Sequence, residues 1–148
     1  MGPTPVRPPT ETDVASRLRL VVFRLRRRLH RQAGGDLTPS QASALASVAR
    51  LGPLPLGELS QVENVRPPTL TKVVAALEEQ GLVVRHVDPR DRRVSRVEMT
   101  ARGSALMAEN RVRSDAYLSA RLASLSAEDR AALERAVGVL ERLLEGDE

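Results

Sequence analysis

The sequence predicts a mainly α-helical fold with one small β-hairpin, an α+β arrangement. Apolar residues make up 41% of the chain and aromatic residues only 1%, so leucine, valine and alanine must build the core, which favours packed helices. Over most of the chain, apolar residues recur at the three- and four-residue spacing of helices. Two short segments, residues 82–87 and 94–99, bracket a polar turn of hairpin length. Helices before and after such a hairpin give the element order of a winged helix-turn-helix between terminal helices.

Composition narrows the classes of function. A net charge of +4 and a pI near 10.8 permit a polyanionic partner. Lys72 is the single lysine among 23 basic residues, and this dominance of arginine fits either a GC-rich genome or selection for phosphate binding. The scarcity of aromatic residues removes the usual platform for stacking single-stranded bases. The absence of cysteine excludes disulfides, thiolate metal sites and cysteine-based redox sensing.

The N-terminal part of the chain predicts an arm followed by a basic helix. Residues 1–12 hold four prolines and few groups that could pack, so we expect a disordered arm there. This segment does not resemble a signal peptide, and no apolar run reaches the length of a membrane span, so we expect a cytoplasmic protein. Residues 13–33 predict a helix with an apolar stripe and seven arginines. Those arginines either pair with acids of the C-terminal helices, the favoured interpretation, or contact phosphate.

The middle of the chain predicts a reader helix and a wing. Residues 38–51 and 56–62 read as two helices, the first capped by Thr38 and Gln41. A further helix from Pro67 to Gln80 places four apolar residues on its inner face (Leu70, Val73, Val74 and Leu77). Its outer face is short, polar or basic near the N-terminus, which suits entry into a DNA major groove.

The C-terminal part predicts two helices that need a partner. Thr100 begins a long helix to Leu125, and Ser126 caps a last helix with a heptad-like seam (Leu133, Val137, Leu140 and Leu144). A small winged unit offers too little surface to cover these helices and the first one, so we expect the terminal helices of two chains to interleave. The expected organisation is one compact domain, with residues 13–37 and 100–148 as dimerisation helices and residues 38–99 as the DNA-binding region.

Two stretches carry a likeness to a known family. Residues 69–85 read TLTKVVAALEEQGLVVR, and residues 88–103 read DPRDRRVSRVEMTARG. Together with the order of elements from Asp13 to Glu145, they resemble the recognition helix and wing of the MarR family of bacterial transcriptional regulators. The resemblance implies a homodimer on a pseudo-palindromic duplex, with recognition helices in major grooves and wings in minor grooves. It also implies a regulator, with repression expected, that is released by a small anionic or aromatic effector.

The resemblance assigns roles to individual residues. Arg93 is the wing arginine expected in the minor groove, beside Arg92, and Asp91 is the acid that orients it. The expected contacts of the recognition helix come from Arg66 (to guanine), Pro68 (to a thymine methyl), Thr69 and Thr71 (to bases or phosphate) and Lys72 (to phosphate). The chain departs from the family's usual serine-rich helix start with Arg66-Pro67-Pro68, where two backbone N–H donors are missing.

Rival functions find less support in the residues. An enzyme is not expected, because His30 and His86 are the only histidines and neither lies in a catalytic or metal-ligand pattern. We therefore expect no catalytic residues, metal or cofactor. The alternatives that stay open are a winged-helix protein-interaction module and a non-specific DNA-binding protein without effector response. The operator, the regulated genes and the effector are not encoded in any pattern of this sequence.

Overall fold

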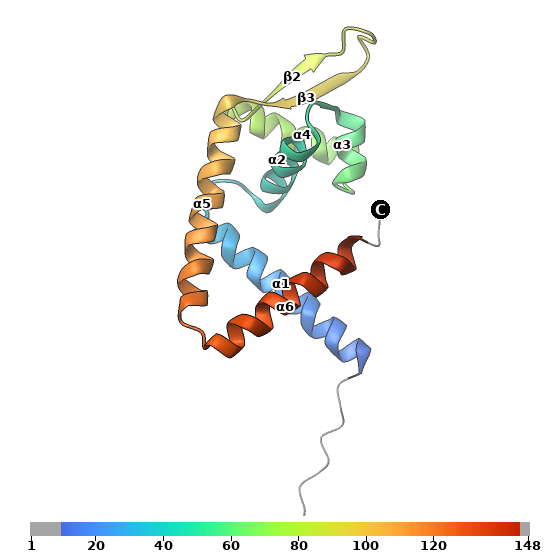
Figure 1. Ribbon diagram of the computed structural model, residues 1–148. Coiled ribbons are helices and arrows are strands. Elements are labelled where there is room, and N and C mark those ends of the chain that lie inside the picture. Colours follow the sequence, from blue (N-terminus) through green and yellow to red (C-terminus); the bar gives the residue numbers. More distant parts are fainter. Residues whose placement is uncertain (1–9, 146–148) are drawn as a thin grey trace, which may run out of the picture.

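The computed structural model describes residues 10–145, which form six helices and three short strands in two regions (Figure 1). One region holds the sheet and three helices, and the other holds the two terminal helices, with α5 running from one to the other (Figure 1). The elements are α1 (Glu11–Gln32), α2 (Pro39–Leu51), β1 (Leu54–Pro55), α3 (Leu56–Val62), α4 (Pro67–Glu79), β2 (Val83–Val87), β3 (Ser95–Met99), α5 (Ala101–Ala123) and α6 (Ala127–Leu144). The mainly helical fold with a hairpin wing is therefore confirmed.

The core lies where α2, α3 and α4 meet the sheet. The inner face of α4 was predicted from its spacing, and Leu70, Val74 and Leu77 are indeed buried while Val73 is partly buried. They pack in one cluster with Leu45 of α2 and with residues of α3 and the sheet. Because these side chains are aliphatic, the core holds α4 in place by shape and apolar burial alone.

The sheet has one strand more than the sequence indicated. β2 and β3 pair antiparallel from Val83↔Met99 to Val87↔Ser95, which confirms the hairpin. The third strand, β1, pairs antiparallel with β3 through Leu54↔Val97, so β3 is central. A strand of two residues next to Pro53 has no periodicity to detect, and only the tertiary pairing defines it.

Helix α1 begins earlier than expected. Thr10 caps it, since the Thr10 hydroxyl accepts from the backbone N–H of Asp13 while the Asp13 carboxylate accepts from the backbone N–H of Thr10. The expected arm of residues 1–12 is therefore wrong at its end, because residues 11 and 12 are helical. The capping box explains why the helix begins two residues before its expected start. Residues 1–9 and 146–148 lie outside the described residues.

The terminal helices leave their apolar faces uncovered. Within residues 10–145, neither α1 nor α6 contains a buried residue. On α1 the exposed large side chains include Val21, Val22, Phe23 and Leu25, and on α6 they include Leu133, Val137, Leu143 and Leu144. The pairing of the α1 arginines with C-terminal acids is also not found within one protomer, since no ion pair among residues 10–145 includes them. No helix in this part of the chain has the length and apolar character needed to cross a membrane.

Candidate nucleic-acid interface and adjoining cleft

At the start of α4, the residues predicted to contact DNA are all exposed on the surface. Arg66 is the N-cap and makes no side-chain capping bond, while Pro67 and Pro68 follow at the first two helical positions. The first N–H groups of a helix have no acceptor within the helix, so the missing N–H groups of the two prolines break no helical hydrogen bond. The proline rings also fix φ near the helical value. The side chains of the five nominated residues (Arg66, Pro68, Thr69, Thr71 and Lys72) are exposed.

Two of these residues are less free than the sequence suggested. The Thr71 hydroxyl donates to the carbonyl of Pro67 at 2.9 Å, so its hydrogen is used within the helix and its oxygen remains as an acceptor. The backbone N–H of Thr69 donates to the carbonyl of Arg66 at 3.0 Å. The two prolines have no N–H, and the N–H of Thr69 is already hydrogen-bonded. An anion at the start of α4 would therefore be bound by side chains and not by backbone donors.

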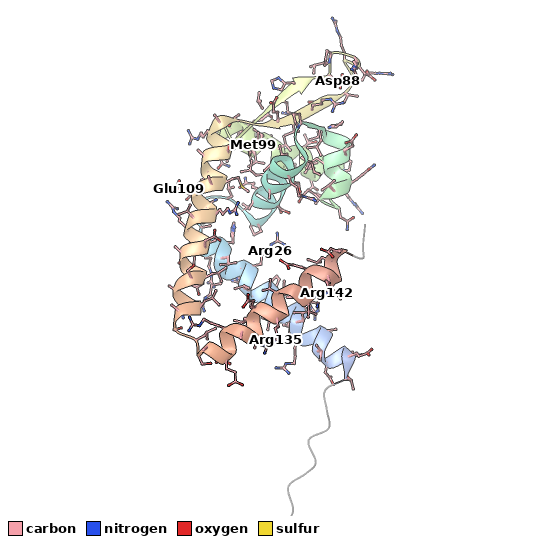
Figure 2. The ribbon with its side chains drawn as sticks, in the orientation of Figure 1. Arg26, Asp88, Met99, Glu109, Arg135 and Arg142 are labelled. Atoms are coloured by element: carbon pink, nitrogen blue, oxygen red, sulfur yellow. The ribbon has the colours of Figure 1, made fainter. Side chains whose placement is uncertain are left out.

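The wing tip is organised around a buried carboxylate, Asp88. It accepts from the backbone N–H of Arg90 at 2.8 Å and from Nε of Arg96 at 2.5 Å, and only 8% of its side chain is exposed. The Arg96 guanidinium and then the Arg90 N–H hold the pKa of Asp88 below its usual range. Its own N–H donates to the carbonyl of Val94, which closes the base of the turn. Figure 2 shows Asp88 at the outer end of the hairpin.

The structure places Asp91 against Arg93. Asp91 Oδ1 accepts from the backbone N–H of Arg93 at 3.0 Å and from its Nε at 3.2 Å, and Asp91 Oδ2 lies 3.4 Å from Nη2. The backbone bond and then the side-chain bonds from Arg93 lower the pKa of Asp91. The side chain of Arg93 is nonetheless 91% exposed, so its guanidinium is oriented without the chain being covered. Arg92 is exposed and forms no hydrogen bond or ion pair with residues 10–145.

Sequence reasoning missed the residues that support these contacts. The sequence assigned Asp88 no role in the wing, yet its carboxylate organises the turn through Arg90 and Arg96. The signal in the sequence is an aspartate at the start of a polar turn. Its carboxylate can accept a hydrogen bond from the backbone N–H two residues later. The second missed contact, between Arg85 of β2 and Glu78 of α4 at 2.6 Å, ties the wing to the recognition helix.

The base of the wing is fastened to α5. Thr100 Oγ1 donates to the carbonyl of Gly81 at 2.6 Å, and the backbone N–H of Thr100 donates to the carbonyl of Leu82 at 3.0 Å. Gly103 lies directly over Leu82, so the first turn of α5, the end of α4 and the start of β2 are in contact. The first turn of α5 is therefore bonded to the segment that joins α4 to β2.

A cleft of about 790 Å³ opens between α1, α2 and α5. Its lining is mostly apolar, with Phe23 and Leu29 from α1, Ala46 from α2 and Ser114 from α5. Arg26 and Arg27 supply its positive charge, and in Figure 2 Arg26 lies on the side of α1 that faces the winged region. Clefts of this size and lining are typical of small-molecule sites. His30, which the sequence left without a role, also lines it.

Comparisons with known proteins converge on one family. The family model described as MarR matches residues 37–95. An HTH-type transcriptional regulator of Mycobacterium tuberculosis is 34% identical over 92% of this chain and 96% of its own length. The HTH-type transcriptional repressor MdtR of Bacillus subtilis is 28% identical over 76% of this chain and 72% of its own. The crystal structure of a Pseudomonas aeruginosa protein assigned as a transcriptional regulator superimposes with a TM-score of 0.79, at 35% identity, over 92% of this chain and 98% of that one.

Proposed function

The chain belongs to the MarR family of DNA-binding transcriptional regulators, and from that membership we propose that it acts as a homodimer on a pseudo-palindromic duplex site. The observation that carries the proposal is the pairing of an exposed helix start at Arg66 with an oriented, exposed wing arginine at Arg93. The two elements are tied by the contact between Arg85 and Glu78, so they would approach DNA as one unit.

The uncovered faces of the terminal helices support a dimer. Large apolar side chains outside the cleft are exposed on both helices, Leu20 and Val21 on α1 and Leu133, Val137, Leu143 and Leu144 on α6, and contiguous exposed apolar residues mark interaction surfaces. A second copy would cover these faces by a two-fold axis, with residues 13–37 and 100–148 as the dimerisation helices. Residues 38–99 would then face outward in both copies as the DNA-binding region.

The start of α4 would contact the DNA major groove and its phosphates. Arg66 would donate to guanine O6 and N7 in the major groove, Pro68 would contact a thymine methyl, and Lys72 would neutralise a phosphate. Thr69 would donate through its hydroxyl, while Thr71 would accept, because its hydrogen is already used within the helix.

The wing would contact the minor groove through Arg93, with Arg92 on the adjacent phosphates. A narrow minor groove concentrates negative potential, so a guanidinium there responds to groove width more than to base identity. Asp91 would limit the conformational entropy that Arg93 loses on binding, because it already holds the guanidinium through Nε.

Repression is the regulatory outcome we propose. A dimer whose recognition helices occupy successive major grooves spans at least one helical turn of DNA between its half-site centres, and that occupancy would exclude other proteins from the same DNA. The similarity to MdtR, which is named a repressor, points the same way.

The cleft is the proposed effector site. The cleft lies between α1, a proposed dimerisation helix, and α2, which packs against α4 in the DNA-binding region. A ligand there would bind one relative position of these two regions more tightly than another. Its apolar lining suits an aromatic ligand, and Arg26 and Arg27 suit an anionic group on that ligand.

Selection of bound sequences from a random duplex pool tests the proposal. A palindrome whose half-sites lie about one helical turn, roughly 34 Å, apart is the expected result. Binding without enrichment would instead indicate a non-specific DNA-binding protein. No binding at any ionic strength would indicate a winged-helix protein-interaction module.

The variant Arg93→Ala then tests the wing. Loss of one arginine contact costs about 1–3 kcal/mol per half-site, so a dimer should bind the selected site at least tenfold more weakly. The matched control is Arg111→Ala, which removes a comparably exposed arginine (84%) from α5 and should leave the affinity unchanged. Equal affinity of Arg93→Ala and Arg111→Ala in an anisotropy titration would remove the wing from the mechanism.

A further inference from the structure

Asn110 carries an unusual buried atom. Its Oδ1 has less than 1 Å² of accessible surface, yet no hydrogen-bond donor among residues 10–145 reaches it. Buried side-chain oxygens in folded proteins almost always have a partner, because an unmade bond leaves the full desolvation cost uncompensated. The oxygen therefore needs a donor from outside this part of the chain.

The space next to Asn110 has the size of one small polar group. A recess of about 20 Å³ lies between the end of α1, the loop after it and α5. A cavity of this volume accommodates a single water-sized group. Besides Asn110, its polar side chains are His30 and Asp36, while Leu37 and Leu106 close it on the apolar side.

The recess adjoins the large cleft. His30, Ala33 and Ala42 line both, so the polar recess forms one end of the apolar cleft described above. A ligand in the cleft whose end group enters the recess would lie beside Asn110. The next turn of α5 continues the same face, since Ser114 lines the cleft.

Arg113 is a basic side chain beside Asn110, since both come within 4.0 Å of the position that a Cβ on Gly34 would take. Arg113 Nη1 donates to the carbonyl of Ala33 at 3.4 Å, and its Nη2 donates to Glu109 Oε1 at 2.5 Å. Asp36 adds carboxylate acceptors to the lining of the recess. No N–H or O–H among residues 10–145 bonds to Asn110 Oδ1, so an incoming donor would supply the missing bond.

We propose that the recess makes the cleft selective for an apolar ligand with a hydrogen-bond donor at one end, and that Asn110 is the specificity-determining residue. Asn110 Oδ1 has less than 1 Å² of accessible surface, so a ligand donor reaches it only when α1 and α5 open slightly around the recess. A ligand whose end group has no hydrogen would leave that oxygen without a bond. This selectivity rests on the proposed function of the cleft as an effector site.

Three bicyclic probes of nearly equal shape test the proposal on the full-length chain. Indole carries an N–H donor, indene carries a CH₂ in its place, and benzofuran carries an acceptor oxygen. Dissociation constants come from ligand-detected NMR titrations. An unmade hydrogen bond to a buried group corresponds to about a tenfold change in affinity, so indole should bind about tenfold tighter than indene and than benzofuran.

Substitutions on one helix assign the preference to its residue. Asn110→Leu keeps the approximate volume and removes the acceptor, so indole and indene should bind equally well. Asn110→Ala repeats the test with a smaller side chain that demands no repacking. The matched control is Ser114→Ala on the same face of α5, which lines the cleft outside the recess and should keep the preference for indole.

Several results would overturn the proposal. These are equal affinities of indole and indene for the native chain, tightest binding of benzofuran, a preference that survives in both Asn110 variants, and no binding of any probe. Duplex selection separates this inference from the proposed function. A chain that selects a palindrome without preferring indole keeps its DNA-binding role and loses the donor-selective recess, whereas the opposite result keeps the recess and loses the DNA-binding role.

Discussion

Gly103 is the position at which the smallest change should most disturb the link between α5 and the wing. It lies in the first turn of α5 and is buried. A Cβ at this position would lie 2.2 Å from the carbonyl oxygen of Leu82 and 2.8 Å from Cγ of Met99. The carbonyl of Leu82 is fixed backbone that also accepts from the N–H of Thr100 at 3.0 Å. Gly103→Ala therefore forces α5 away from the start of β2.

The size of the effect follows from these distances. Cβ atoms essentially never approach another heavy atom within 3.0 Å, so a contact of 2.2 Å demands a shift of at least 0.8 Å. Overpacking of this kind costs about 1–3 kcal/mol. A weakened bond from Thr100 to Leu82 adds about 1 kcal/mol, and the better helix propensity of alanine returns about 1 kcal/mol. The net loss is about 2 kcal/mol, or roughly 5–8 °C in Tm for a chain of this size.

Gly138→Ala is the matched control, because it makes the same substitution in α6. A Cβ there would meet only the flexible end of Arg142, at 3.6 Å. With no clash, alanine should raise the free energy of unfolding by about 0.5–1 kcal/mol. Urea unfolding of both variants decides the matter. If Gly103→Ala were as stable as Gly138→Ala, the contact with Leu82 would not hold α5 against the wing.

Two further predictions concern the turns of the reader. Asn64 adopts a φ of +50° between α3 and α4, so Asn64→Val should lower the free energy of unfolding by about 1–2 kcal/mol in urea titrations, whereas Asn64→Gly should stay within about 1 kcal/mol of the native chain. Equal stability of the two variants would contradict this. Asp88→Asn should reduce amide-exchange protection of the hairpin and weaken specific DNA binding, because Arg96 loses its carboxylate. The pKa of Asp88 is lowered by Arg96, so its stabilising effect is complete above about pH 4 and is lost as the pH falls through the lower folded value. Exchange protection that is equally sensitive to acid in native chain and Asp88→Asn would refute this role.

The sequence predicted the parts of the fold that depend on periodicity. Leu70, Val74 and Leu77 repeat at helical spacing, and their burial confirms the orientation of α4. That orientation exposes Thr69 and Lys72 by geometry alone, since they lie on the opposite face. Segments too short to show a periodic pattern of apolar residues were not predicted. The strand Leu54–Pro55 is one of them, because it is defined only by its pairing with β3.

The site was less predictable because it depends on contacts between distant segments. Asp88 and Arg96 are eight residues apart, and pairing across the hairpin brings them together. His30 and Asn110 come from helices that meet only in the folded chain, so neither has a local pattern that indicates a recess. Residue types alone made His30 look structural and gave Asn110 no role.

The position of α5 explains how a ligand in the cleft would reach the DNA-binding surface. Its first turn contacts Leu82 through Gly103, while Asn110 and Ser114, two and three turns further on, line the recess and the cleft. Helix α5 is unbroken from Ala101 to Ala123, and if it moves as one body, widening of the cleft at Ser114 would also shift Gly103 and its contact with Leu82. A ligand shifts this equilibrium only by its difference in affinity between the two positions of α5. The donor-acceptor match at Asn110 supplies such a difference, because the recess lies between α5 and the end of α1 and accepts its donor fully in one spacing of the two helices.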